Sequence, residues 1–171
     1  MPGVAPRLFL LAVAAAALFI FRTSAVLPAL VASHFDARGA PNGWMSRETY
    51  RGVALAAAVL LPLLVTFGTV LAVRTSPEAL KLPQQAYWFA PERRAASQQY
   101  VAAMFFRIGT LVTMLVAALH YTVLRAHAVQ PPHLPAVTFF TILGAFGALL
   151  VLVLVTMTMH FRKVPAARTV G

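Results

Sequence analysis

Four long hydrophobic runs, separated by more polar connections, dominate the pattern of this chain. They cover residues 8–26, 53–73, 104–124 and 136–159, and the last contains no charged residue. A helix needs about 20 residues to cross the roughly 30 Å hydrocarbon core of a bilayer, so each run is long enough to span it. Because lipid offers the backbone no hydrogen bonds, continuous runs of this length predict helices. Arg7 precedes the first run as in a signal peptide, but a signal core covers only about 7–15 residues, which favours a membrane helix.

The composition agrees with a membrane protein. Hydrophobic residues make up 60% of the 171 residues and charged residues only 11%, whereas soluble domains carry about 25% charged residues. Cysteine is absent, which excludes disulfides, thiolate metal sites and a cysteine nucleophile. The net charge is +10. The basic residues mostly flank the hydrophobic runs, so we expect membrane lipids as partners and no nucleic acid.

The basic residues also predict the orientation. With four spans, the N-terminus, the 74–103 connection and the C-terminal tail share one side of the membrane. That side carries eight basic residues, namely Arg7, Arg74, Lys81, Arg93, Arg94, Arg162, Lys163 and Arg168. The other side carries four, namely Arg38, Arg47, Arg51 and Arg125. Short cytoplasmic segments are enriched in Lys and Arg, so we expect a multi-pass protein of the cell membrane with both termini in the cytoplasm.

The predicted fold is therefore one all-α integral membrane domain over residues 1–171, a four-transmembrane-helix bundle. One extracytoplasmic loop covers residues 27–52 and one cytoplasmic loop covers residues 74–103. In the first loop, "GAPNG" at 39–43 has turn chemistry, because Pro presets φ and Asn-Gly tolerates positive φ. In the second, Pro91 and Glu92 predict a helix start, so the third helix is expected to project beyond the membrane. Pro62 predicts a kink and a freed carbonyl in the second helix.

The candidate site residues of the first loop are His34, Asp36 and Trp44. His34 and Asp36, two positions apart, could share a divalent metal or a proton path with His120, the ionisable group that lies well inside a span. The alternative is that the histidines are interfacial, Asp36 forms a turn and Trp44 anchors the chain at the membrane surface.

Two arginines lie within the ends of the hydrophobic runs. Arg22 and Arg107 are each expected to extend toward the headgroups, since a charge at the membrane centre costs about 2.5–3.5 kcal/mol. A sharper hypothesis pairs Arg22 with Asp36 across the loop. Arg107 would likewise meet Glu92 or the Tyr87 hydroxyl on the other side.

The second loop supplies the remaining candidate ligand-binding residues. Tyr87 and Trp88 are typical of an aromatic belt at the headgroups, or of a lid that re-enters the bundle. Glu92, beside Arg93 and Arg94, could act as a catalytic acid, although an ion pair in the first turn of a helix is far commoner.

Two ordered motifs resemble a family. The first, "LPALVASHFDARGAPNGWMSRETY" (27–50), contains Leu27-Pro28, His34-Phe35, Gly39, Trp44 and Ser46-Arg47. The second, "LPQQAYWFAPERR" (82–94), contains Leu82-Pro83, Tyr87-Trp88 and Pro91-Glu92-Arg93-Arg94. Both are similar to the signature of a bacterial membrane-protein family, described as a domain of unknown function, that shares its domain with SdpI-type immunity proteins. The resemblance implies a multi-pass protein of immunity or regulatory type.

Three functional interpretations follow. The first is a non-enzymatic membrane protein that binds or senses a peptide, a lipid or a membrane-protein partner, alone or as an oligomer. The second is a membrane-embedded metal- or lipid-dependent enzyme that uses His34, Asp36 and His120, or Glu92. The third is a small transporter subunit. The four carboxylates of the chain are not clustered in one motif, which favours the first interpretation.

Overall fold

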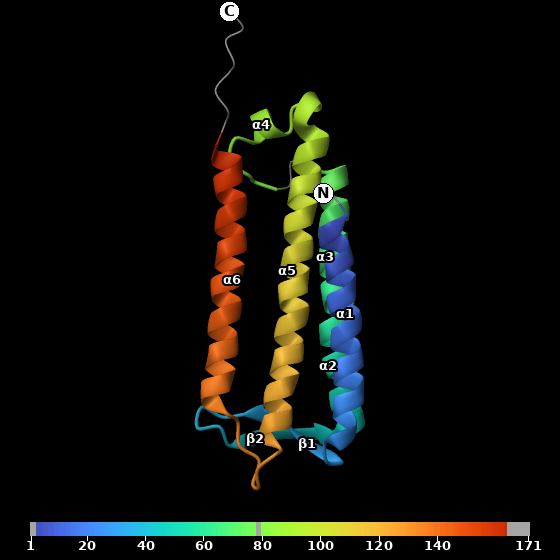
Figure 1. The fold of residues 1–171 in the computed structure, drawn as a ribbon, viewed down its shortest axis with the longest axis vertical. Helices are drawn as coiled ribbons and strands as arrows, with labels where there is room; N and C mark the ends of the chain where they lie inside the picture. Colours follow the sequence, from blue (N-terminus) through green and yellow to red (C-terminus); the bar gives the residue numbers. More distant parts are fainter. Residues whose placement is uncertain (1–2, 78–79, 164–171) are drawn as a thin grey trace, which may run out of the picture.

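The computed structural model describes residues 3–77 and 80–163 and contains four long helices that are apolar enough to cross a membrane (Figure 1). The first is α1 (Val4–Thr23), extended by a short 3₁₀ turn, η1 (Ser24–Val26). The second consists of α2 (Arg47–Leu55), a π-helical turn, η2 (Ala56–Leu60), and α3 (Leu61–Thr75). The third and fourth are α5 (Pro91–Ala126) and α6 (Ala136–Arg162). The predicted four-helix membrane architecture is thus confirmed.

Consecutive long helices run in opposite directions (Figure 1). We call one end of the bundle the terminal end, because α1 begins and α6 ends there, together with the short helix α4 (Gln85–Trp88). The other is the hairpin end. The third helix begins at Pro91, as expected from the sequence, and has 36 residues. At 1.5 Å per residue it is about 54 Å long, so it extends well beyond a 30 Å hydrocarbon core.

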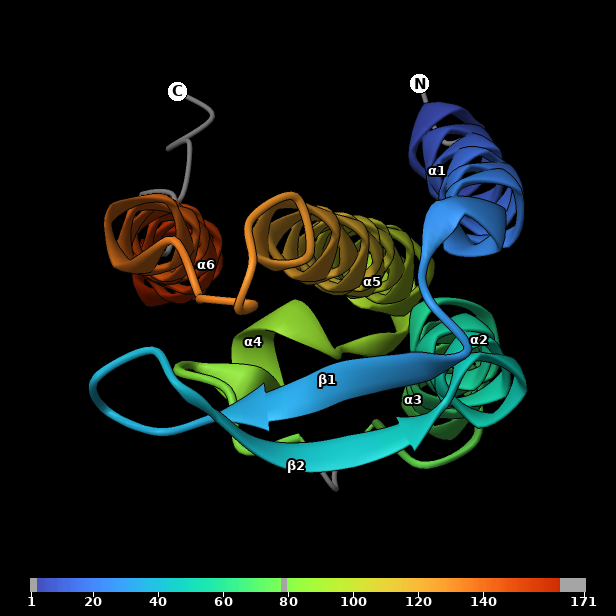
Figure 2. The ribbon, with the colours of Figure 1, turned by 90° about the horizontal axis from the view of Figure 1, so that it is seen from below.

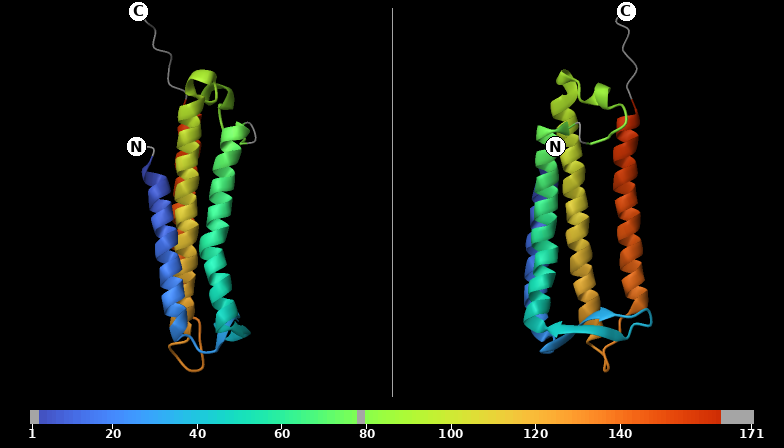
Figure 3. Two further views of the ribbon diagram at one scale, coloured as in Figure 1. Left: turned by 90° about the vertical axis from the view of Figure 1, so that its right-hand side faces the viewer. Right: turned by 180° about the vertical axis from the view of Figure 1, so that it is seen from behind.

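Helix α5 is the centre of the bundle. It packs against α1 and α3 on one side and against α6 on the other (Figures 2 and 3). One core cluster joins Phe9 of α1, Val70 of α3 and Phe106 of α5. Gly109 of α5 lies against Phe9 and Thr66, where a Cβ atom would collide with both side chains. A glycine at this position therefore lets three helices approach closely.

The second span is irregular where Pro62 interrupts it. Proline has no N–H to donate to the preceding turn of the helix. The widened π-helical turn over Ala56–Leu60 directly precedes Leu61 and Pro62. At the same turn, the buried Thr113 hydroxyl of α5 donates to the Ala58 carbonyl oxygen at 3.4 Å. The irregularity expected at Pro62 is thus accommodated within the bundle.

The connection over residues 27–52 is more regular than the sequence suggested. Strands β1 (Leu30–Phe35) and β2 (Pro41–Ser46) form an antiparallel hairpin, which runs across the hairpin end from α2 toward α6 (Figure 2). The predicted turn at 39–43 is displaced, because the chain reverses over Asp36–Gly39, where Gly39 has φ +83°. Pro41, Asn42 and Gly43 lie in β2 instead.

The side chain of Asp36 explains this displacement. Its Oδ1 accepts hydrogen bonds from the backbone N–H groups of Arg38 and Ala40, both at 2.9 Å, which closes the turn before residue 41. Gly43 then pairs with His34 across the two strands. A Cβ on Gly43 would lie 3.0 Å from the Cβ of His34, so this glycine accommodates the neighbouring side chain and makes no turn.

Candidate functional site

A buried polar cluster joins three helices close to the hairpin end. His120 of α5 is 2% exposed, and both of its ring nitrogens have partners. Its Nδ1 lies 2.8 Å from the Tyr50 hydroxyl of α2, and its Nε2 lies 2.8 Å from Thr23 Oγ1 of α1. The Tyr50 ring stacks on the imidazole, and the Phe19 ring meets it edge-on.

The direction of these hydrogen bonds assigns the histidine tautomer. Thr23 Oγ1 donates its proton to the Phe19 carbonyl oxygen at 2.6 Å, so toward His120 it acts as an acceptor. His120 therefore carries its proton on Nε2 and accepts the Tyr50 O–H on Nδ1. The resulting chain runs from Tyr50 through His120 and Thr23 to the backbone of α1. In this neutral tautomer both ring nitrogens of His120 have hydrogen-bond partners within the cluster, so the cluster can hold the three helices together.

The predicted metal ligands are not brought together. His34 lies on β1 with its side chain exposed, and its Nδ1 is 3.0 Å from the Ser33 hydroxyl. The Asp36 carboxylate closes the hairpin turn, and His120 is buried between helices. In residues 3–77 and 80–163, no group of three or more His, Cys, Asp or Glu side chains is placed to hold a metal ion.

Two other histidines hold the hairpin on the bundle. His127, which follows α5, accepts the Ala32 N–H on Nε2 at 3.0 Å, and its Nδ1 lies 3.0 Å from the Val123 carbonyl oxygen. His133 lies against Gly39, and the next residue, Leu134, donates its N–H to the Gly39 carbonyl at 2.9 Å. These contacts give His127 and His133 a positioning role in the structure.

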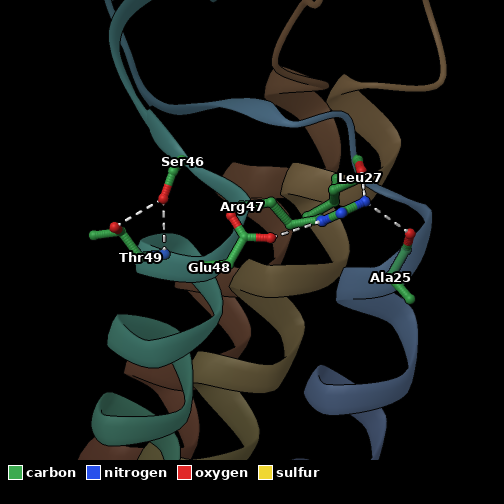
Figure 4. Close-up of polar contacts among 6 residues, drawn as sticks. All are labelled: Ala25, Leu27, Ser46, Arg47, Glu48 and Thr49. Atoms are coloured by element: carbon green, nitrogen blue, oxygen red, sulfur yellow. Dashed lines mark hydrogen bonds and ion pairs between the residues drawn. The ribbon is translucent and has the colours of Figure 1, made fainter.

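The Ser46-Arg47 pair of the first motif joins two helices (Figure 4). Ser46 caps α2 by accepting the Thr49 N–H. Arg47 Nη1 donates to the carbonyl oxygens of Ala25 and Leu27, at 3.3 and 3.1 Å, just after α1. Its Nε lies 3.5 Å from a Glu48 carboxylate oxygen. Because Arg47 begins α2, its bonds to the Ala25 and Leu27 carbonyls link the end of the first span to the start of the second.

The other candidates at this end do not form the expected pair. The one ion pair within the described part of the chain is Arg47–Glu48, so Arg22 does not pair with Asp36. The carboxylate of Asp36 is instead turned into its own hairpin loop. Arg22 is exposed near the end of α1, and Trp44, 47% exposed on β2, is available as the membrane-surface anchor predicted for it.

At the terminal end, Trp88 and Tyr87 attach α4 to the bundle. Trp88 Nε1 donates to the Phe161 carbonyl oxygen of α6 at 2.9 Å, and the Trp88 carbonyl accepts the Ser97 hydroxyl of α5. Arg93 Nε donates to the Tyr87 carbonyl at 2.8 Å, with the guanidinium 4.0 Å from the centroid of the Tyr87 ring. Tyr87 is therefore bound by Arg93, where the sequence suggested Arg107.

Arg107 also does not meet Glu92. Both residues belong to α5, and their separation of 15 positions corresponds to about 22 Å along the helix. Glu92 is exposed in the first turn of α5. Arg107 instead donates from Nη1 to Met104 Sδ, at 3.2 Å, and lines a groove.

Two grooves flank the first turns of α1 near the terminal end, and sequence reasoning missed both. The apolar groove, about 360 Å³, lies between α1, α5 and α6; its lining includes Val4, Leu8, Arg107, Thr110, Leu149 and Leu152. The polar groove, about 520 Å³, lies between α1, α3 and α5; its lining includes Pro6, Arg74, Gln98, Gln99 and Phe106. Ala103 lines both. The sequence feature that marks this region is Arg107, a charged residue within a hydrophobic run.

Comparison with protein-family models, with curated proteins and with solved structures finds no match to this chain. The two motifs at 27–50 and 82–94 therefore carry the family resemblance without further support.

Proposed function

We propose that this chain is a non-enzymatic protein of the cell membrane that binds an amphiphilic molecule from the bilayer. Both termini lie in the cytoplasm in this proposal, as the distribution of basic residues predicts. The observation that carries the proposal is the apolar groove between α1, α5 and α6, which has aliphatic walls and one cationic side chain, Arg107. A binding or sensing role also agrees with the immunity or regulatory type that the family resemblance implies.

The arrangement of polar groups supports binding over catalysis. A catalytic acid or base must reach its substrate, and a metal site needs several ligands in one place. His120 is buried, with both ring nitrogens hydrogen-bonded, and Asp36 is bound to its own backbone. His34 and Glu92 lie at opposite ends of the bundle. None of these four residues lines either groove.

The groove has the features expected of a site for an amphiphile. Val4 and Leu8 of α1, Leu111 of α5 and Leu149 of α6 supply apolar walls. The Arg107 guanidinium and the Thr110 hydroxyl belong to the same groove. The guanidinium can donate hydrogen bonds to a polar head, whereas Thr110 donates its proton to the Phe106 carbonyl oxygen and can only accept. A few polar groups in a largely apolar groove are typical of ligand sites.

The test is native mass spectrometry of the full chain purified in a mild detergent. An Ala103→Phe variant narrows both grooves, because Ala103 lines each of them. Ala145→Phe is the matched control, since Ala145 is exposed on α6 and lines neither groove. We expect wild type and Ala145→Phe to retain a lipid-sized mass that Ala103→Phe loses. A wild-type chain without such a mass, or equal retention in both variants, would contradict the proposal; melting temperatures verify that each variant is folded.

A further inference from the structure

The position of Arg107 along α5 places the apolar groove at the membrane boundary. Arg125 ends the hydrophobic part of α5 at the hairpin end and donates to the Tyr121 hydroxyl at 3.1 Å. Twenty residues, or about 30 Å, lead back from Arg125 to residue 105, so the opposite boundary of the hydrocarbon core lies close to Arg107. The groove also contains Val4 and Leu8, the first turns of α1, which places it at the same level.

The charge of Arg107 is directed toward the headgroups. A long side chain on a helix points back toward the helix N-terminus, which for α5 is the terminal end of the bundle. In that direction the polar groove begins, since Ala103, one turn before Arg107, lines both grooves. A molecule whose apolar part lies in the apolar groove would therefore bring its polar part to this junction.

The polar groove continues the site at headgroup level. Gln98 and Gln99 lie about two turns before Arg107 on α5, and Arg74 lies in the last turn of α3. The Gln98 side-chain amide donates to the carbonyl oxygens of Val73 and Arg74, at 3.0 and 3.2 Å. These bonds hold the end of α3 against α5, and so they position Arg74, the cationic residue of the polar groove.

The charge of the two grooves selects the class of ligand. Each groove contains an arginine, and no acidic side chain of the described residues lines either groove. Arginine donates strong, paired hydrogen bonds to phosphate oxygens. The polar groove, about 520 Å³, offers more space than a single carboxylate fills, which favours a phosphate-bearing headgroup over a fatty acid.

We infer that the two grooves together bind one anionic glycerophospholipid. Its acyl chain lies along the apolar groove, its phosphate lies beside Arg107, and its headgroup lies toward Arg74 and Gln99. This inference rests on the proposed function and names the ligand of that site.

The test compares two phospholipids with the same acyl chains, one with an anionic and one with a zwitterionic headgroup. The full chain, in detergent, is titrated with phosphatidylglycerol or with phosphatidylcholine of identical acyl chains, and bound lipid is counted by native mass spectrometry. Near a membrane surface an arginine contributes about 1 kcal/mol toward an anionic lipid, a factor of about five. We expect wild type to prefer phosphatidylglycerol at least fivefold, Arg107→Gln to lose most of that preference and Arg107→Lys to retain part of it. Arg22→Gln, at the hairpin end of α1, should leave it unchanged.

The outcomes separate the inference from the proposed function. Equal affinity for the two lipids, with both displaced by Ala103→Phe, would overturn the anionic selectivity and leave groove binding intact. Binding that Ala103→Phe does not affect would overturn both. An excess of inorganic phosphate should not displace phosphatidylglycerol, because the acyl chain also binds; displacement would mean that the site recognises a free anion and not a lipid.

Discussion

Single residues act here mainly by satisfying the polar groups of their neighbours. In the described part of the chain, every buried side-chain nitrogen or oxygen has a hydrogen-bond partner. Lipid offers no replacement for a lost partner, so such bonds hold helices together. His120, Thr23 and Tyr50 form one such tie between three helices. The exposed Asp36 instead accepts two backbone N–H groups within the hairpin turn.

Replacing His120 with leucine should destabilise the bundle by about 1–3 kcal/mol. The variant removes two interhelical hydrogen bonds, and such bonds in membrane proteins average about 0.6 and reach about 1.7 kcal/mol each. Tyr50→Phe removes one of them and should cost about half as much. The measurement is unfolding of the full chain in bicelles by titration with SDS. His34→Leu is the control, because His34 is exposed; an equal effect of His34→Leu and His120→Leu would contradict the assigned tie.

Substitutions of Asp36 distinguish a turn residue from a metal ligand. Asp36→Asn retains the side-chain oxygen that accepts the N–H groups of Arg38 and Ala40, so the hairpin should keep its stability. Asp36→Ala removes both bonds and should make the hairpin more sensitive to protease, since each is worth about 0.5–1.5 kcal/mol. If Asn behaved like Ala, and metal analysis showed a loss of bound metal in both variants, the predicted metal site would be supported instead.

At the scale of elements, the second span and the hairpin depart from simple helices and loops. The second span contains a π-helical turn next to Pro62, and the hairpin occupies residues that carry turn-forming types. Both departures depend on partners far away in the sequence. Thr113 binds the carbonyl of Ala58, and His127 binds the N–H of Ala32. Contacts between distant segments thus supply hydrogen-bond partners to backbone groups of the π-helical turn and of the hairpin.

The Thr113 hydroxyl should matter most while Pro62 is present. Thr113→Val removes the donor to the Ala58 carbonyl and should cost about 1 kcal/mol in the wild-type chain. In a Pro62→Ala background the helix can supply a backbone N–H to this turn, so the same substitution should cost less. A double-mutant cycle, read from SDS unfolding, measures the difference. Equal costs in both backgrounds would show that Thr113 does not compensate for the proline.

At the scale of the whole molecule, the antiparallel order of the spans brings toward one end those of the eight predicted cytoplasmic basic residues that the structure describes. Seven of them lie within the described residues, and Arg168 lies outside them. The same order places the first and last spans beside α5, so that the two grooves form at the terminal end. Orientation in the membrane therefore decides which leaflet would supply the proposed lipid.

The orientation can be tested without removing any native thiol, because the chain has no cysteine. Ala37 lies in the hairpin turn and Ser76 follows α3 at the terminal end, and both are exposed. In intact cells, a membrane-impermeant maleimide should label Ala37→Cys and not Ser76→Cys, because the termini are proposed to be cytoplasmic. Detergent should make both reactive, which controls for local accessibility. The reverse pattern in intact cells would invert the topology.

Local sequence was sufficient for the four spans, for their antiparallel order and for the helix start at Pro91. Each of these depends on properties that neighbouring residues share: continuous hydrophobicity over the thickness of a bilayer, and the fixed φ of proline. The length of the third helix beyond the membrane also followed from Pro91 and Glu92.

Side-chain partners depended on the packed chain, because they join positions far apart in sequence. Thr23, Tyr50 and His120 belong to three different helices, and nothing near Thr23 or Tyr50 marks them as partners of a histidine. The hairpin turn lies at Asp36–Gly39 because one Asp36 carboxylate oxygen accepts two backbone N–H groups there. Residue preferences alone do not decide between this turn and one at residues 39–43. The grooves arise only once α1, α3 and α6 lie against α5. Hydrophobicity is summed along the chain, whereas hydrogen bonding and cavity shape require atoms placed in three dimensions.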